Sequence, residues 1–306
     1  MTRSTFPTQF FQCTPTHRRL AFSEVGNRNS SDVLLCLPGL LETRATFDPL
    51  LHAATSLQGL RVISLDMCGR GDADPLPHDK GYAMSVYLDD VVQFLKREVM
   101  HDADVAPRVH VLGTSMGGIL GMYLASDKSH GIQSLTLNDM GLSLKWLSIY
   151  GLYDSMKQAG RMPEPHELAE QLHVSIGAVL AVQSPAHFDL PYRKDWTGMQ
   201  FGHLLKRFQG RLRLVHGGAS GVCLPEQVRE MHNAFAQLEV LEVPDAKHPA
   251  PFNAAVCGFV LQGLGAHKAH QPNVPPVVVQ AQALPQPVQN KRWWHTIMRH
   301  LNATKK

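Results

Sequence analysis

The sequence predicts an α/β protein built on a mostly parallel, doubly wound sheet. Two observations carry this prediction. Short continuous apolar runs alternate with stretches in which apolar residues recur at helical spacing. One such run, 109–112, leads directly into Gly113-Thr114-Ser115-Met116-Gly117 and then into a helix-like stretch of small and aliphatic residues, 119–125. Continuous apolar runs are typical of central parallel strands, because helices cover both of their faces.

Length and composition set the broad class. A chain of 306 residues with 44% apolar and 18% charged residues suits one large α/β domain with an insertion, or two small domains. The five cysteines are scattered without a CxxC pair, as expected of buried thiols in a reducing compartment. No leader-like apolar segment and no apolar run of about 18 residues occurs, so we expect a cytoplasmic body.

Charge is distributed unevenly along the chain. Residues 268–306 hold six Lys or Arg and no acid, which leaves 23 bases against 26 acids in residues 1–267. The net charge of +3 therefore belongs to the tail, and the body has no basic surface of the kind that binds nucleic acid. The 17 histidines form no HExxH motif and no Cys/His cluster, so we expect surface histidines and no metal site.

The elements follow from local patterns. Residues 17–26 alternate apolar and polar side chains and end in a Gly-Asn turn, which predicts an edge strand. Residues 82–95 show helical spacing. In chain order, strands are expected at 17–26, 33–37, 60–66, 109–112, within 132–141 together with the loop that ends it, and at 211–216 and 238–243. Helices are expected at 82–95, 119–125 and 226–235.

Residues 142–204 interrupt this alternation of strands and helices. Three stretches in this insertion, 144–156, 164–173 and 174–182, are expected to be helical, with loops at proline-containing segments between them. Apolar and aromatic side chains in the insertion suggest an apolar pocket wall, although most of them are expected to form the core of the insertion.

The strand, the G-x-S-x-G turn and the following helix together make a nucleophile elbow. Such a turn lifts the hydroxyl of Ser115 off the sheet, and the glycines at 113 and 117 allow the close backbone packing that it needs. The helix that follows directs its first N–H groups at any oxyanion formed beside the serine. Ser115 is therefore the candidate nucleophile.

The chain resembles the α/β-hydrolase superfamily, on three stretches that span nearly all of residues 1–267. These are Leu37-Pro38-Gly39-Leu40, the elbow 113–118 and the loop that carries His248. The resemblance implies that the backbone N–H groups of Leu40 and Met116 form the oxyanion hole and that His248 is the general base. It also implies that residues 142–204 are a helical cap inserted after the strand that follows the elbow helix.

The acid of the catalytic triad departs from the family pattern. The family places an Asp in the loop after the strand 211–216, but this position, aligned on Ser220, is Gly221. Asp139 lies at the carboxyl end of the strand that follows the elbow helix, the edge where functional groups gather in parallel sheets, and some superfamily members take their acid from there. Asp139 is equally compatible with a loop residue that binds backbone N–H groups. Asp245, three residues before His248, is not favoured because its side chain is expected to point away from the ring.

The last 39 residues differ from the body. Residues 268–290 hold five Pro and five Gln, which predicts an extended linker. Residues 291–306 combine two tryptophans, apolar residues at helical spacing and basic flanks, a pattern that suits weak contact with an anionic membrane surface or an acidic partner. A disordered basic end without a role is an equal alternative.

The leading functional interpretation is a serine hydrolase that acts on a small or medium carboxylic ester without a cofactor. Ser115 would be the nucleophile, His248 the base and Asp139 the acid. The alternative is a catalytically impaired α/β-hydrolase that binds a ligand or a partner, and Gly221 is the residue that favours it.

Overall fold

The computed structural model describes residues 3–77, 81–100, 106–148, 164–183 and 198–264. The chain divides into two units, 1–271 and 272–306. The predicted linker 268–290 and tail 291–306 lie outside the described residues. Among the described residues, no helix has both the length and the apolar character required to cross a bilayer.

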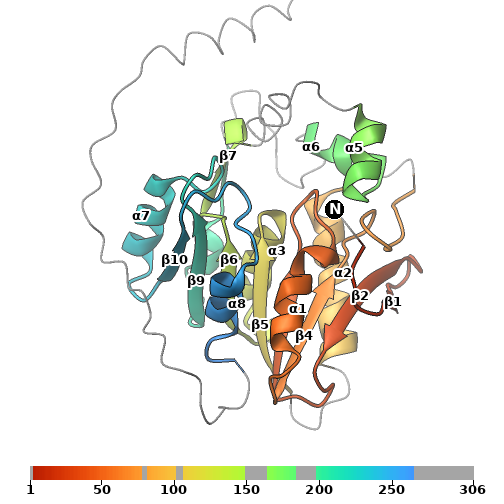
Figure 1. The fold of residues 1–306 in the computed structure, drawn as a ribbon, viewed down its shortest axis with the longest axis horizontal. Coiled ribbons are helices and arrows are strands. Elements are labelled where there is room, and N and C mark those ends of the chain that lie inside the picture. The colour runs from red at the N-terminus through yellow and green to blue at the C-terminus, as the bar shows by residue number, and fades with distance from the viewer. Residues whose placement is uncertain (1–2, 78–80, 101–105, 149–163, 184–197, 265–306) are drawn as a thin grey trace, which may run out of the picture. The chain divides into compact units, whose positions relative to one another are not determined.

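Most strands of the described residues join one eight-stranded sheet, in the order β1-β2-β4-β3-β5-β6-β9-β10 (Figure 1). The pairs β1–β2 and β2–β4 are antiparallel and the others are parallel. The strands are β1 (Gln9–Gln12), β2 (Arg19–Val25), β3 (Asp32–Leu37), β4 (Leu60–Leu65), β5 (Arg108–Thr114), β6 (Ile132–Asn138), β9 (Arg211–Gly217) and β10 (Glu239–Val243). The predicted mostly parallel sheet is thereby confirmed.

Helices pack on both faces of this sheet (Figure 1). The α-helices of the main body are α1 (Asp48–Ala54), α2 (Met84–Phe94), α3 (Met116–Ser126), α7 (Pro225–Ala234) and α8 (Ala254–Leu261). Shorter helical turns are η1 (Arg44–Phe47), η2 (Leu95–Val99), η3 (Lys128–His130) and η5 (Gly202–Leu205). The insertion contributes α5 (Pro165–Leu172), α6 (Ile176–Gln183) and an antiparallel pair, β7 (Ser143–Lys145) with β8 (Gly198–Gln200).

Two apolar cores lie on opposite faces of the sheet, and β3 contributes to both. Val33, Leu35 and Leu37 join the core that packs against α2, α3 and α7. Leu34 and Cys36 join the core that packs against α1 and α8. Because successive side chains of a strand point to opposite faces, a strand covered on both sides must be apolar throughout. This requirement explains the continuous apolar runs of the sequence.

Parallel register aligns the carboxyl ends of the central strands. Leu37 at the end of β3 pairs with Gly113 of β5, and Thr114 pairs with Asn138 at the end of β6. The segments that follow these strands begin at Pro38, Ser115 and Asp139 and therefore meet at one edge of the sheet.

Two sequence-based expectations are wrong. The strand predicted at the edge, seen as β2, lies inside the sheet, because β1 pairs along its outer side. The helix predicted from residue 144 does not begin there, since Leu144 and Lys145 pair with Met199 and Gly198 as strand β7. Helical structure begins at 146, and residues 149–163 lie outside the described residues. Helices α5 and α6 confirm the other two helical stretches of the insertion.

Candidate active site

Ser115 occupies the turn between β5 and α3 with φ +50° and ψ −113°, a conformation that non-glycine residues rarely adopt. The flanking glycines are required by close backbone contact. A Cβ at Gly113 would lie 2.2 Å from the carbonyl oxygen of Gly117, and a Cβ at Gly117 would lie 2.0 Å from the carbonyl oxygen of Leu37. The first turn of α3 therefore packs directly on the end of β3, as the elbow requires.

The end of β6 joins the elbow to the loop of His248. The N–H of Ser115 donates to the carbonyl oxygen of Asn138 (3.3 Å). The side-chain amide of Asn138 donates to the carbonyl oxygen of Ala250 (3.0 Å), two residues after His248. The next residue, Asp139, has φ +57°. Asn138 thus connects the backbone of the elbow to the loop of His248.

Asp139 and His248 are in direct contact. The Nδ1 atom of His248 lies 2.8 Å from Oδ2 of Asp139, and the two side chains are 6% and 0% exposed. The Asp139 carboxylate also accepts hydrogen bonds from the N–H of Gly217 (3.0 Å) and the hydroxyl of Ser220 (2.7 Å). Because an ionised carboxylate can only accept, this network assigns the imidazole proton to Nδ1 and leaves Nε2 free to take a proton.

Gly221, the position of the family's usual acid, has no such contact. Its backbone is exposed, and a Cβ built there would meet no atom within 4 Å. Its neighbour Ser220 contacts Asp139 instead. Asp245 is exposed. Three positions were considered from the sequence for the acid of the triad. Of these, Asp139 is the one whose side chain contacts His248.

The loop after β3 is held by hydrogen bonds between Gly39 and Glu42. The carbonyl oxygen of Gly39 accepts from the N–H of Glu42 (3.2 Å), while the N–H of Gly39 donates to Oε2 of Glu42 (2.7 Å). The peptide between Gly39 and Leu40 is therefore held by its oxygen, with the N–H of Leu40 on the opposite side. Within the described part of the chain, neither this N–H nor that of Met116 donates to a protein acceptor. Two free donors on neighbouring segments suit an oxyanion.

Glu42 is a buried carboxyl group beside this loop, only 5% exposed. Burial raises the pKa of Glu42 above its ordinary value, and the opposing influences of the Gly39 N–H and of nearby His248 are smaller. Glu42 is thus both the anchor of the oxyanion loop and a second titratable group near the imidazole.

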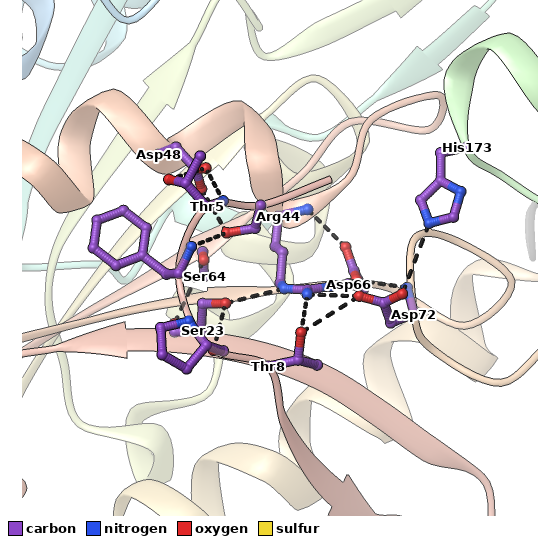
Figure 2. A network of polar contacts seen from close by, with 12 residues as sticks. Thr5, Thr8, Ser23, Arg44, Asp48, Ser64, Asp66, Asp72 and His173 are labelled. Carbon is purple, nitrogen blue, oxygen red and sulfur yellow. Dashed lines mark hydrogen bonds and ion pairs between the residues drawn. The ribbon is translucent and has the colours of Figure 1, made fainter. Parts of the chain in front are cut away.

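A polar network lies behind this loop and is centred on Arg44 (Figure 2). The guanidinium forms an ion pair with Asp66, a second one with Asp72 (2.7 Å) and hydrogen bonds with Ser23 (3.1 Å) and Thr8 (2.5 Å). The N–H of Arg44 also donates to Asp66 (2.7 Å). Burial raises the pKa of Asp66, and the adjacent guanidinium opposes this effect. The network fixes the start of η1, the segment that follows the oxyanion loop.

One group of side chains has metal-ligand types. Ligand atoms of Asp139, His216 and Cys223 lie within 4.8 Å of one another, and all three residues are buried. Their chemistry does not fit a metal. Both Asp139 oxygens already accept hydrogen bonds, and Nε2 of His216 contacts the carbonyl oxygen of Cys223 (3.1 Å). Burial raises the pKa of the Cys223 thiol well above its ordinary value, whereas a thiol binds metal as the thiolate.

Three residues that shape this site were not singled out by the sequence analysis. Ser220 served only to locate the expected acid, and Glu42 and Asn138 carried no prediction. Glu42 follows the Pro-Gly turn by three residues, a spacing at which a side chain can return to a turn N–H, and this was the one available signal.

Comparison with known proteins points to the same fold. Residues 32–159 match a family model described as alpha/beta hydrolase fold. The chain is 28% identical over 267 residues to a 3-hydroxybutyrate-oligomer hydrolase of Cupriavidus necator, an alignment that covers 76% of this chain and 88% of that protein. It is 36% identical over 114 residues to a putative carbamate hydrolase, RutD, of Variovorax paradoxus, covering 37% of this chain and 40% of that protein.

Solved structures show the same fold. A hydrolase from Pseudomonas aeruginosa PA01 superposes with a TM-score of 0.64 and 19% identity, covering 86% of this chain and 100% of that one. At this identity the likeness concerns the fold alone.

Proposed function

Because this chain belongs to the α/β-hydrolase superfamily and its relatives are hydrolases, we propose that it hydrolyses small or medium carboxylic esters through an acyl-enzyme on Ser115. The observation that carries the proposal is the 2.8 Å contact between His248 and Asp139. It supplies the oriented base that a serine nucleophile requires.

The residues divide the first half-reaction among them. The hydroxyl oxygen of Ser115 attacks the ester carbonyl carbon while Nε2 of His248 takes the hydroxyl proton. The carbonyl oxygen becomes an oxyanion, which accepts hydrogen bonds from the N–H groups of Leu40 and Met116. Asp139 stabilises the imidazolium through Nδ1. The intermediate then expels the alcohol, which receives its proton from Nε2, and the acyl group stays on Ser115.

Water completes the cycle by the same route. His248 removes a proton from water, and the resulting nucleophile attacks the acyl carbon. The second tetrahedral intermediate uses the same two N–H donors. Its collapse returns the proton to Ser115 and releases the carboxylic acid.

The relatives favour an ester over a carbamate. The protein named for 3-hydroxybutyrate oligomers, which are chains of ester-linked hydroxy acids, aligns along most of both chains. The protein named as a carbamate hydrolase aligns over 40% of its length. Short esters of acids and hydroxy acids are therefore the first substrates to test.

The alternative, a binding module without catalysis, loses its main support. It depended on the presence of Gly221 at the usual position of the acid. Asp139, which follows β6, contacts His248 instead. The backbone of Ser115 also keeps the conformation of a nucleophile elbow.

The test measures turnover of p-nitrophenyl esters of increasing acyl length together with covalent labelling by a fluorophosphonate. Wild type is compared with Ser115→Ala and with a matched control, Ser126→Ala, which removes an exposed hydroxyl from the last residue of α3. A p-nitrophenyl carbamate serves as the competing substrate class.

We expect wild type and Ser126→Ala to hydrolyse the esters and to be labelled, and Ser115→Ala to do neither. Ester hydrolysis that persists in Ser115→Ala would overturn the nucleophile assignment. A wild-type protein that neither turns over nor labels would overturn the hydrolase mechanism, and faster cleavage of the carbamate would overturn the ester preference.

A further inference from the structure

Arg70 is a buried guanidinium that the mechanism above does not use. It lies in the loop after β4 and is 0% exposed. Its hydrogen bonds go to the carbonyl oxygen of Leu40 (2.6 Å), the carbonyl oxygen of Cys68 (2.9 Å) and the hydroxyl of Tyr87 (3.1 Å). Within the described residues, none of the hydrogen-bond partners of this guanidinium is a carboxylate. Burial of a charge without a counter-ion is unfavourable, and here these hydrogen bonds and a cation–π contact with the Tyr87 ring (4.9 Å to the centroid) offset it.

The Leu40 contact lies next to the oxyanion hole. Nε of Arg70 binds the oxygen of the peptide that follows Leu40, while Glu42 holds both polar groups of Gly39. Three successive peptides of this loop therefore each have one anchored group. The Leu40 N–H, which belongs to the middle peptide, is the group left free. Rotation of this N–H away from the site would require movement of the anchored peptides on either side or loss of the Gly39–Glu42 bond.

Arg70 is itself held in place by the insertion. It pairs with Val174 in an antiparallel bridge, in the segment that joins α5 to α6. Backbone hydrogen bonds flank this pair: the N–H of Gly71 donates to the carbonyl oxygen of His173 (2.9 Å), and the N–H of Ser175 donates to the carbonyl oxygen of Gly69 (2.5 Å).

The packing at this junction is close. Gly69 has φ +75°, and a Cβ there would lie 2.7 Å from the hydroxyl of Ser175. Nε2 of His173 lies 3.8 Å from Asp72, which is also bound to Arg44, as the dashed lines in Figure 2 show. The 173–175 segment thus fixes the backbone of Arg70, and the Arg70 side chain reaches the oxyanion loop.

We propose that Arg70 is a positioning residue that holds the Leu40 peptide in the orientation needed to stabilise an oxyanion. This inference rests on the proposed ester hydrolysis, because it assigns Arg70 to the same oxyanion hole. The contribution of Arg70 is made in the transition state, where negative charge reaches the carbonyl oxygen, so its loss lowers kcat more than it raises KM.

Two substitutions test the assignment. Arg70→Met keeps the apolar stem and removes the buried charge together with the Leu40 contact. Arg70→Lys keeps the charge, but one ammonium cannot span the three acceptors. Arg213→Met is the matched control, because Arg213 is a guanidinium 1% exposed in β9 with contacts to Glu239 and Val260.

The readouts are kcat, KM and the inhibition constant of an alkyl boronic acid, which forms a tetrahedral adduct on Ser115 with an oxygen in the oxyanion hole. Loss of an oxyanion donor lowers kcat by about 10²- to 10³-fold, and a displaced donor should lower it by roughly 10- to 100-fold. We expect this loss in both Arg70 variants, a matching rise in the boronic acid constant and a KM within about threefold of wild type.

For Arg213→Met we expect a lower melting temperature with kcat and the boronic acid constant unchanged. Arg70 variants with wild-type kcat, or with equal losses in kcat and in ground-state affinity, would overturn the positioning role alone. If wild type itself neither hydrolyses esters nor binds the boronic acid, the proposed function fails and the Arg70 assignment falls with it.

Discussion

Replacement of Asp139 by Asn tests the site most directly, because it changes charge and hydrogen-bonding capacity with little change in shape. The carboxylate accepts from three donors: the Gly217 N–H, the Ser220 hydroxyl and Nδ1–H of His248. An asparagine offers one acceptor oxygen and one amino group. One side of the new amide must therefore face a donor that it cannot satisfy.

The backbone decides which side that is. The N–H of Gly217 belongs to β9 and cannot turn away, so the amide oxygen stays with it. The amino group then faces His248. The Ser220 hydroxyl oxygen already accepts from the N–H groups of Val222 and Cys223 and cannot take the amino group. His248 is left to accept through Nδ1, which moves the ring proton to Nε2.

A ring with its proton on Nε2 cannot take the proton of Ser115. Reversal of the tautomer in this way lowers kcat by about 10⁴-fold, or roughly 5 kcal/mol of transition-state stabilisation. The assay is p-nitrophenyl ester turnover at neutral pH, with Ser115→Ala as the background. Asp245→Asn is the control, because Asp245 is exposed on the same loop as His248 and should keep wild-type turnover.

Turnover in Asp139→Asn within about tenfold of wild type would refute the reasoning. It would mean that the 2.8 Å contact does not set the tautomer and that another group orients His248.

Three further predictions concern the surroundings of the site. Ser220→Ala removes a hydrogen bond to the Asp139 carboxylate, and such a bond is worth about 1.5–3 kcal/mol. We expect kcat to fall about tenfold or more at constant KM. An unchanged kcat would contradict this prediction. Gly117→Ala places a Cβ 2.0 Å from the carbonyl oxygen that ends β3 and should lower the free energy of unfolding by about 3 kcal/mol in a denaturant titration. Gly258→Ala, in α8 with open space around the new Cβ, is the control and should be neutral or stabilising. Burial raises the pKa of Glu42 above its ordinary value of 4.5. The contribution of Glu42 to the free energy of unfolding is therefore full below pH 4.5 and is lost as the pH rises through the raised pKa. Glu42→Gln keeps a hydrogen-bond acceptor but does not titrate. Its melting temperature should therefore rise relative to that of wild type between pH 4.5 and 8. A difference in melting temperature that stays constant over this range would argue against the pKa shift.

The elbow and the sheet could be predicted from local sequence because their physical requirements are local. A strand covered on both faces must be apolar along its length, and the turn at Ser115 must have glycines on either side. Both requirements appear as patterns within about a dozen residues. The loop that carries His248 was recognised through the superfamily resemblance.

The rest of the site depends on contacts between residues far apart in the chain. Asp139 stayed open at the level of sequence, because its distance from His248 depends on how the end of β6 meets the loop after β10, 109 residues later. Arg70 binds Leu40 across 30 residues, and no spacing rule connects them. The roles of these residues could not be read from periodicity.

The two wrong elements have the same cause. The pattern of residues 144–145 is compatible with a helix, but pairing with 198–199 makes them a strand. The alternating pattern of β2 correctly indicated a strand. Its place inside the sheet is set by β1, a strand of four residues that is too short to give a recognisable sequence pattern.

The bridge between Arg70 and Val174 limits how this molecule can be re-engineered. A designer who wishes to change substrate range would replace the insertion as a separate part, cut between β6 and β9. Such an exchange also removes the 173–175 segment that supports Arg70. We expect a chimera without this segment to have a lowered kcat, whatever its new specificity. Grafts that retain 173–175 and vary the chain on either side are the ones in which a change of selectivity can be measured without a loss of turnover.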